Sequence, residues 1–336
     1  MITNIEISKS IKYQIPYLNS KEFKNQFNMG WGYFYIYHFR EFKDIYLAVK
    51  EFNFTSLPVF TDLVIKKLKI KPVQTPWDRE GRRINEYINA FKKLALLSEN
   101  NELVDRTLFL DSEIGNELTK NDLTIFKNLF FRYYRFREIM SWFLNPLNNV
   151  SRNELIENIT EEKLISESKV IYSYSNKSRF NDTFFFKLKD NTPIYYINND
   201  DEDFMRFWDV FISWAKNLGL VEKINLKSLN ITLSNHKKSI TCVYFLSEAE
   251  STFDLYDYIQ DNFKSKYINT AKLVINLAIK YRLPIESIKN QIVKQCKEKK
   301  NKLSMQRTSR VFIRDKTELN CIPKVNNYYI SHIMVI

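Results

Sequence analysis

Nine side chains near the C-terminal end have the chemistry that is needed to hold a polyanion. Ammonium and guanidinium groups neutralise phosphates and release the counterions that surround nucleic acid. Amide and guanidinium groups also form hydrogen bonds with the edges of bases. The nine residues are Asn290, Gln291, Lys294, Lys297, Lys299, Lys300, Arg307, Arg310 and Arg314. Their types and close spacing predict a surface that binds nucleic acid.

The positive charge of the chain is concentrated in the same region. The 336 residues include 51 Lys and Arg and 39 Asp and Glu, for a net charge of +12. Residues 263–316 hold 15 of the basic and 3 of the acidic residues, so the rest of the chain is neutral. This distribution favours a single module that faces a polyanion. The alternative is that a lysine-rich helix is only a solvated face.

Three helices and two strands are expected to position these side chains. Apolar spacing predicts helices over 253–263 and 271–281, and Asn269 or Thr270 can cap the second of them. A third helix is expected over 284–302, because proline is accepted in the first turn of a helix. Two strands, rich in β-branched and aromatic residues, should follow at Val311–Ile313 and Tyr328–Ile336, with a turn-rich span between them.

The third helix is expected to have two different faces. Its apolar side chains recur at helical spacing and should be buried: Ile285, Ile288, Ile292 and Cys296. Its amide and ammonium side chains fall on the other face: Asn290, Gln291, Lys294 and Lys297. That face is therefore the candidate for contact with the groove and the backbone of nucleic acid.

Three helices followed by a two-stranded ribbon resemble the winged helix-turn-helix architecture. The resemblance covers about Thr252–Ile336 and lies in the element order and the charge, without a specific sequence motif. It implies that Pro284–Lys302 corresponds to the recognition helix. It also implies that Arg307, Arg310 and Arg314 lie on or beside the wing.

The whole chain is predicted to be α+β and mostly helical, with successive small winged-helix-like units joined by a long central helix. The expected parts are an N-terminal helical, winged-helix-like domain (1–115), a connector helix (116–150), a middle α+β domain (151–250) and the C-terminal basic domain (251–336). The connector is expected as one helix over 119–144, capped by Thr119 and ended by Pro146.

Within these parts, hydrophobic spacing predicts individual elements. In the N-terminal part these are helices over 39–52, 57–70 and from Arg82 to Leu97, and a strand over 103–110. In the middle part they are a hairpin of strands 184–188 and 193–197, a helix over 204–218, and strands 221–224, 229–233 and 240–246. The aromatic run 33–37 could stack on bases, but a place in an aromatic core is favoured.

Several function classes are disfavoured by the composition. Only five glycines occur, and neither dinucleotide-binding nor P-loop glycine patterns are present. The three histidines lie far apart, and the three cysteines include no C-x-x-C pair, so no metal or cofactor is expected. No signal peptide and no long apolar stretch are found, which predicts a cytoplasmic protein with no membrane partner.

The sequence therefore predicts a non-catalytic DNA-binding protein, although its residues do not by themselves separate DNA from RNA. One alternative is a protein-interaction subunit of a bacterial mobile-element or phage-defence complex, which would have other protein subunits as partners. A second alternative is a cryptic metal-dependent nuclease with its site around Asp200–Asp203. The favoured interpretation of those acids is a helix N-terminus, which stabilises negative charge.

Overall fold

A computed structural model describes most of the chain, and the residues that it describes fall into separate stretches. These are residues 4–5, 36–52, 57–68, 82–98, 100–104, 106–144, 170–175, 182–187, 195–198, 202–226, 232–233, 238–239, 242–247, 251–308 and 316–336.

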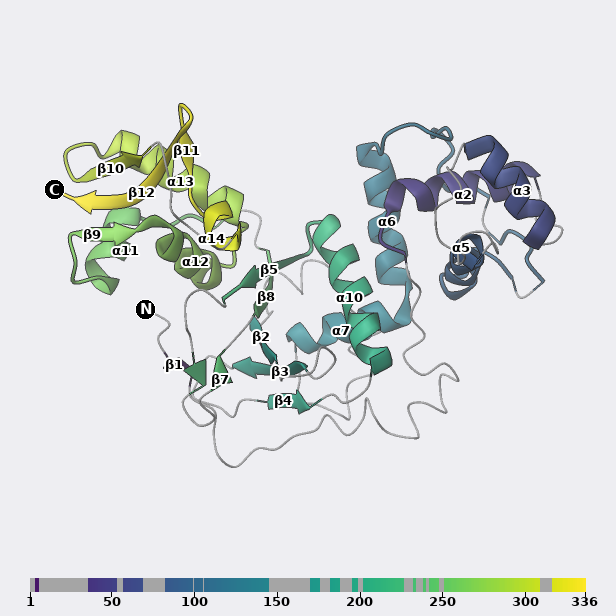
Figure 1. Ribbon diagram of the computed structural model, residues 1–336, viewed down its shortest axis with the longest axis horizontal. Helices are drawn as coiled ribbons and strands as arrows, with labels where there is room; N and C mark the ends of the chain where they lie inside the picture. Colours follow the sequence, from purple (N-terminus) through teal and green to yellow (C-terminus); the bar gives the residue numbers. More distant parts are fainter. Residues whose placement is uncertain are drawn as a thin grey trace.

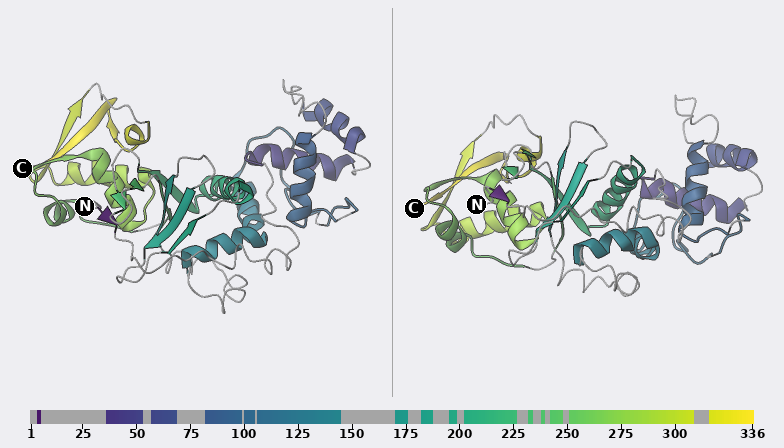
Figure 2. Two further views of the ribbon diagram at one scale, coloured as in Figure 1. Left: turned by 60° about the horizontal axis from the view of Figure 1, so that its bottom comes forward. Right: turned by 90° about the horizontal axis from the view of Figure 1, so that it is seen from below.

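The described parts follow one another along an elongated molecule (Figure 1). Helices α2 (Phe39–Phe52), α3 (Leu57–Leu68) and α5 (Arg82–Lys93) form one end, and a β-sheet lies in the middle. The C-terminal helices and their own sheet form the other end, and two further views show the same sequence of parts (Figure 2). Helical residues outnumber strand residues, so the predicted mostly helical α+β class is confirmed.

The predicted strand 103–110 is wrong. Leu103 forms only an isolated bridge with Leu97, and turns follow. Phe109 has φ of 55°, in the left-handed region, which interrupts an extended strand. Its ring is buried between Tyr46 and Phe126, with centroids 5.6 and 5.3 Å away. The segment thus packs one aromatic side chain into the core instead of pairing with another strand.

The predicted connector helix is divided in two. Helix α6 (Lys120–Arg132) begins with the expected cap at Thr119, which forms a capping box with Asp122. It ends at Tyr133, whose φ and ψ of −77° and 113° are extended, and α7 (Tyr134–Leu144) starts at once. The tyrosine side chain is buried, so packing of aromatic residues at the junction has overridden helix continuity.

The middle sheet has five antiparallel strands in the order β4-β3-β2-β8-β5. They are β2 (Val170–Ser175), β3 (Asp182–Lys187), β4 (Tyr195–Asn198), β5 (Val221–Asn225) and β8 (Cys242–Leu246). The predicted hairpin corresponds to β3 and β4, and the strand predictions at β5 and β8 are also confirmed. The central strand β2 was not predicted. Part of the predicted strand 229–233 lies outside the described residues.

Three two-residue strands, β1 (Asn4–Ile5), β6 (Thr232–Leu233) and β7 (Lys238–Ser239), form a separate small sheet. Helix α10 (Glu202–Asn217) begins within the acidic run and confirms the predicted helix 204–218. Asp200 and Asp201 lie outside the described residues, so the nuclease alternative stays a prediction there.

The middle sheet separates two hydrophobic cores. Val243 and Phe245 of β8 face the C-terminal core, whereas Tyr244 and Leu246 face the core shared with the N-terminal helices. This alternation is the two-residue period of a strand that is covered on both faces. The core shared with the N-terminal helices also includes Trp214 of α10 and therefore runs across the first three predicted domains. The predicted domain boundaries themselves stay a prediction.

Residues 251–336, called the C-terminal module below, contain four helices and four strands among the described residues. They are α11 (Leu255–Asn262), β9 (Tyr267–Asn269), α12 (Thr270–Tyr281), α13 (Ile285–Glu298), β10 (Leu303–Thr308), α14 (Lys316–Asn320), β11 (Lys324–Val325) and β12 (Tyr328–Val335). The three predicted helices and the last strand are confirmed, and Asn269 caps α12 through a hydrogen bond from the backbone N–H of Lys272.

The module differs from the prediction in its strands and in one helix end. Helix α13 ends at Glu298, with Lys299 as its C-cap, whereas the predicted helix continued to Lys302. Strand β10 begins at Leu303. The predicted strand 311–313 lies outside the described residues. The expected turn-rich span contains α14 and β11. Strand β12 pairs with β10 on one side and with β9 and β11 on the other, which places β12 between β9 and β10.

Candidate nucleic-acid interface

Helix α13 has the two faces that its sequence predicts. Ile288, Ile292 and Cys296 are buried in the core of the module. The opposite face is exposed to solvent and consists of Glu286, Asn290, Lys294 and Lys297. These four residues recur about once per turn, so they form one row along the helix.

A third row on α13 holds the start of the module. Gln291 donates a hydrogen bond to the backbone carbonyl of Ser251 (3.3 Å), and Gln295 donates one to the carbonyl of Phe253 (2.7 Å). Lys299 forms an ion pair and a hydrogen bond with Asp254, which hold the pKa of that carboxyl below its usual value. Gln291 and Lys299 were predicted to contact nucleic acid, and here they contact their own chain.

Four of the remaining predicted cations are accessible. Lys297 and Lys300 are exposed and form no ion pair with any residue that the structure describes. Lys294 lies 4.0 Å from Glu298 with a side chain that is 75% exposed, which makes this a weak pair. Arg307 is exposed on β10. Arg310 and Arg314 lie outside the described residues, so their placement stays a prediction.

Two more lysines of the module lie over tyrosine rings. The Nζ atom of Lys302 is 4.7 Å from the centroid of Tyr256 on α11. The Nζ atom of Lys280 is 4.7 Å from Tyr258 and 5.5 Å from Tyr281. These cation–π contacts fix the positions of two charges that would otherwise move freely. The contacts with Tyr256 and Tyr258 were not predicted, because these rings are more than twenty residues from their lysines in sequence.

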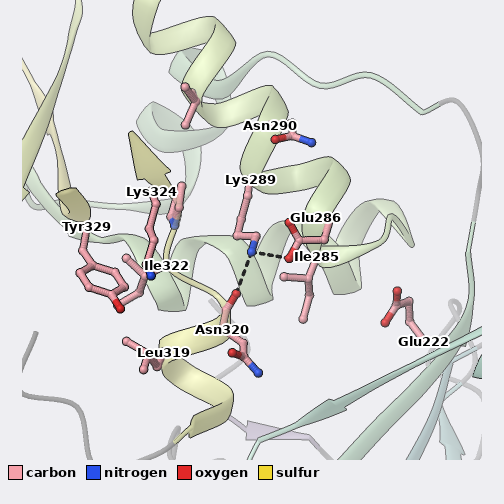
Figure 3. A pocket seen from close by; sticks show the side chains of 12 residues that line it. Glu222, Ile285, Glu286, Lys289, Asn290, Leu319, Asn320, Ile322, Lys324 and Tyr329 are labelled. Atoms are coloured by element: carbon pink, nitrogen blue, oxygen red, sulfur yellow. Dashed lines mark hydrogen bonds and ion pairs between the residues drawn. The ribbon is translucent and has the colours of Figure 1, made fainter. Parts of the chain in front are cut away.

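A groove of about 780 Å³ lies between the N-terminal half of α13, the segment from α14 to β12, and the middle sheet (Figure 3). Its lining residues are Glu222, Ile285, Glu286, Lys289, Asn290, Val293, Leu319, Asn320, Ile322, Pro323, Lys324 and Tyr329. Lys289 forms an ion pair with Glu286 and donates a hydrogen bond to the carbonyl of Asn320 (3.0 Å). The Nζ atom of Lys324 lies 4.4 Å from the ring centroid of Tyr329.

Glu222 of β5 is the one groove residue contributed by the middle sheet. Burial raises the pKa of its carboxyl, Lys216 acts in the opposite direction, and the nearby Glu286 raises the pKa further. No described residue forms a hydrogen bond or an ion pair with this carboxylate. Its role could not be predicted, because Glu222 and α13 are more than sixty residues apart in sequence.

A buried group of charges at the other end of the molecule is structural. Lys43 of α2 is fully buried and donates a hydrogen bond to the carbonyl of Asn116 (2.8 Å). The carboxylate of Asp44 accepts one from the backbone N–H of Gly115 (3.1 Å), and Asp122 accepts one from the N–H of Thr119 (2.8 Å). These contacts hold the loop before α6 against α2 and against the start of α6.

Neither a cluster of metal ligands nor a membrane-spanning helix is present among the described residues. The described residues contain no group of three or more His, Cys, Asp and Glu side chains that could hold a metal ion. No helix within the described ranges is long and apolar enough to span a bilayer.

No protein-family model, curated protein or solved structure matches this chain.

Proposed function

We propose that this protein binds DNA without catalysis, and that its C-terminal module is a winged-helix-like unit in which α13 is the recognition helix. The order of elements supports this proposal. Helix α11, strand β9 and helices α12 and α13 come first, and β10 and β12 form the ribbon that follows. The position of β12 between β9 and β10 also fits a winged-helix sheet.

The exposed row of α13 is the observation that carries the proposal. An amide and two ammonium groups, on Asn290, Lys294 and Lys297, lie together on the face that is not used for packing. Lys300 and Arg307 add exposed charges beyond the end of this helix. Such a combination can contact base edges through the amide and phosphates through the cations.

The proposal assigns different roles to the nine predicted residues. Asn290, Lys294, Lys297, Lys300 and Arg307 contact DNA directly. Gln291 and Lys299 instead support α13 through their contacts with residues 251–254. Arg310 and Arg314 are proposed as wing contacts on the strength of the sequence alone.

The test is the dependence of duplex affinity on salt. Each lost phosphate contact should reduce the magnitude of the log–log slope by about 0.9, so Lys297→Ala with Lys300→Ala should reduce it by roughly 2. The matched control is Lys66→Ala with Lys120→Ala, because both of these lysines are exposed on helices far from α13. Equal slopes for the wild type and both double variants, or no binding by the wild type, would contradict the proposal.

Docking of a protein partner is a second candidate function, and exposed apolar side chains at the N-terminal end favour it. Val104 and Leu110 are 58% and 66% exposed. Leu110 borders a groove of about 590 Å³ that is also lined by Leu47, Phe109 and Ile114. Light scattering after native purification would test this function: Leu110→Asp should release a bound subunit, and a wild-type monomer without a partner would count against it.

A further inference from the structure

Helix α13 is charged differently at its two ends. Along its exposed row, Glu286 comes first, Asn290 is neutral, and Lys294 and Lys297 follow. The N-terminal half of the helix lines the groove shared with the middle sheet, whereas the exposed Lys297 lies beyond that groove. The two halves of the proposed recognition helix therefore present different charges to an approaching polyanion.

The cations of the groove are already engaged. The ammonium group of Lys289 is held by Glu286 and the carbonyl of Asn320, and its side chain is only 15% exposed. Lys324 lies over the ring of Tyr329. Neither lysine contacts Glu222, whose carboxylate lies across the groove from α13 (Figure 3).

Glu222 thus forms no ion pair with a described residue of the groove, and Lys216 of α10 is the cation that acts on its carboxylate. The carboxylate is half-buried on β5, and no ion pair to it is formed by the part of the chain that the structure describes. Charges with low-dielectric walls act more strongly on their surroundings than charges in open solvent. A phosphate that entered the groove would meet this carboxylate on one side and, on the α13 side, that of Glu286, which is paired with Lys289.

We infer that Glu222 and Glu286 exclude the nucleic-acid backbone from the groove, so that DNA is held at the C-terminal half of α13. This inference rests on the proposed function, since it concerns how the same helix meets DNA. The two carboxylates act by repulsion and contact no phosphate. They confine the interface to Lys294, Lys297 and the cations beyond them.

The experiment compares variants that remove the same number of charges. Glu222→Gln with Glu286→Gln should raise duplex affinity at low salt roughly fivefold or more, because like-charge repulsion is lost. The control is Asp62→Asn with Asp111→Asn, which changes the net charge equally at exposed N-terminal positions. The control should change affinity less than twofold. In hydroxyl-radical footprinting, the protected DNA segment should become longer at one end with the groove variant and should stay the same with the control.

The possible outcomes separate the two proposals. If the wild type binds with a steep salt dependence but the groove variant behaves as the control does, the exclusion by Glu222 and Glu286 is overturned and DNA binding stands. If the wild type does not bind duplex at all, both proposals fall. Glu222→Gln alone keeps the Glu286–Lys289 pair and provides the comparison if the double variant is unfolded.

Discussion

Gln295 and Leu255 are joined by a hydrogen bond that links the last turn of α13 to the first residue of α11. The side-chain oxygen of Gln295 accepts from the backbone N–H of Leu255 at 2.8 Å, while its nitrogen donates to the carbonyl of Phe253 at 2.7 Å. One side chain thus satisfies two backbone groups at the entry to the module. The free N–H groups at a helix start need such partners.

Replacing Gln295 by alanine should destabilise the module by about 1–3 kcal/mol, because the substitution leaves two backbone groups without their partner. The measurement is the free energy of unfolding in urea. Gln260→Ala is the matched control, since Gln260 is exposed on α11, and it should change stability by less than about 0.5 kcal/mol. Equal stability of the two variants would show that water replaces the Gln295 contacts at no cost.

Phe126→Ala should have the largest effect among substitutions in the N-terminal core. Its ring stacks on Phe39 with centroids 4.3 Å apart and meets Trp214 of the middle part edge-on at 5.9 Å. Removal of a buried phenylalanine costs about 3–5 kcal/mol. Because these rings join the N-terminal helices to α10, both parts should lose stability together in hydrogen exchange.

Leu123→Ala on the same helix is the control for Phe126, because Leu123 is exposed. It should leave hydrogen exchange in both parts unchanged. Protection lost only among the N-terminal helices of the Phe126 variant would mean that α10 is stable without this contact.

The helices of the C-terminal module could be predicted because each has a complete local signal. Asn269 is a capping residue, α12 is apolar on most sides, and Ile288, Ile292 and Cys296 repeat at helical spacing. The local preferences of these segments therefore agree with the tertiary packing of the module.

Other parts of the structure depend on contacts between distant residues, and the sequence does not indicate them. Strand β10, with the sequence LSMQRT, has no aromatic residue and only one β-branched residue, Thr308, and it forms because β12 pairs with it. The break at Tyr133 depends on neighbouring rings. Glu222 joins the groove only because β5 lies beside α13. The sequence therefore predicted which residues are basic or polar. It did not predict that Gln291 and Lys299 would be engaged by residues 251–254.

Cys296 should react much more slowly with a thiol reagent than Cys242. No disulfide joins the three cysteines, all of which the structure describes, and burial raises the pKa of the Cys296 thiol to about 12. Cys242 is only partly buried. At pH 8, a disulfide reagent should therefore modify one thiol quickly and Cys296 only as the module unfolds. Cys242→Ser should abolish the fast phase. A fast phase that survives in that variant would mean that a thiol of the module is accessible in the folded state.

Asp122 should make stability depend on pH in the acid range. Burial acts to raise the pKa of its carboxyl, but hydrogen bonds from Ser112 and Thr119 outweigh burial and the pKa is lowered. Because the pKa is lower in the folded state, the ionised carboxylate stabilises the fold above the unfolded pKa of about 3.9. This stabilisation is lost as the pH falls through the folded pKa. Asp122→Asn should therefore cost about 1–3 kcal/mol at pH 7 and progressively less below pH 4.

The control for Asp122 is Asp111→Asn, because Asp111 is exposed on the preceding loop. Its unfolding free energy should follow that of the wild type at every pH. If the loss of unfolding free energy in the Asp122 variant were the same from pH 7 to pH 3, the charge of the carboxylate would not contribute to stability.

Glu222 should make DNA affinity rise as the pH is lowered. Burial raises the pKa of its carboxyl, so the group is protonated at a higher pH than an exposed glutamate, and the repulsion of phosphate is lost there. The charged groups that face it are Glu286 and Lys289 of α13, Lys324 of β11 and Lys216 of α10.

The measurement is duplex affinity from pH 7.5 to pH 5 at constant ionic strength. The wild type should bind more tightly as the pH falls, and Glu222→Gln should bind tightly throughout and lose most of this dependence. His332→Gln serves as the comparison, because His332 lies on β12 opposite Gln306 of β10 and outside the groove. If the pH dependence disappears in the His332 variant and persists in Glu222→Gln, the histidine and not the groove carboxylate is responsible.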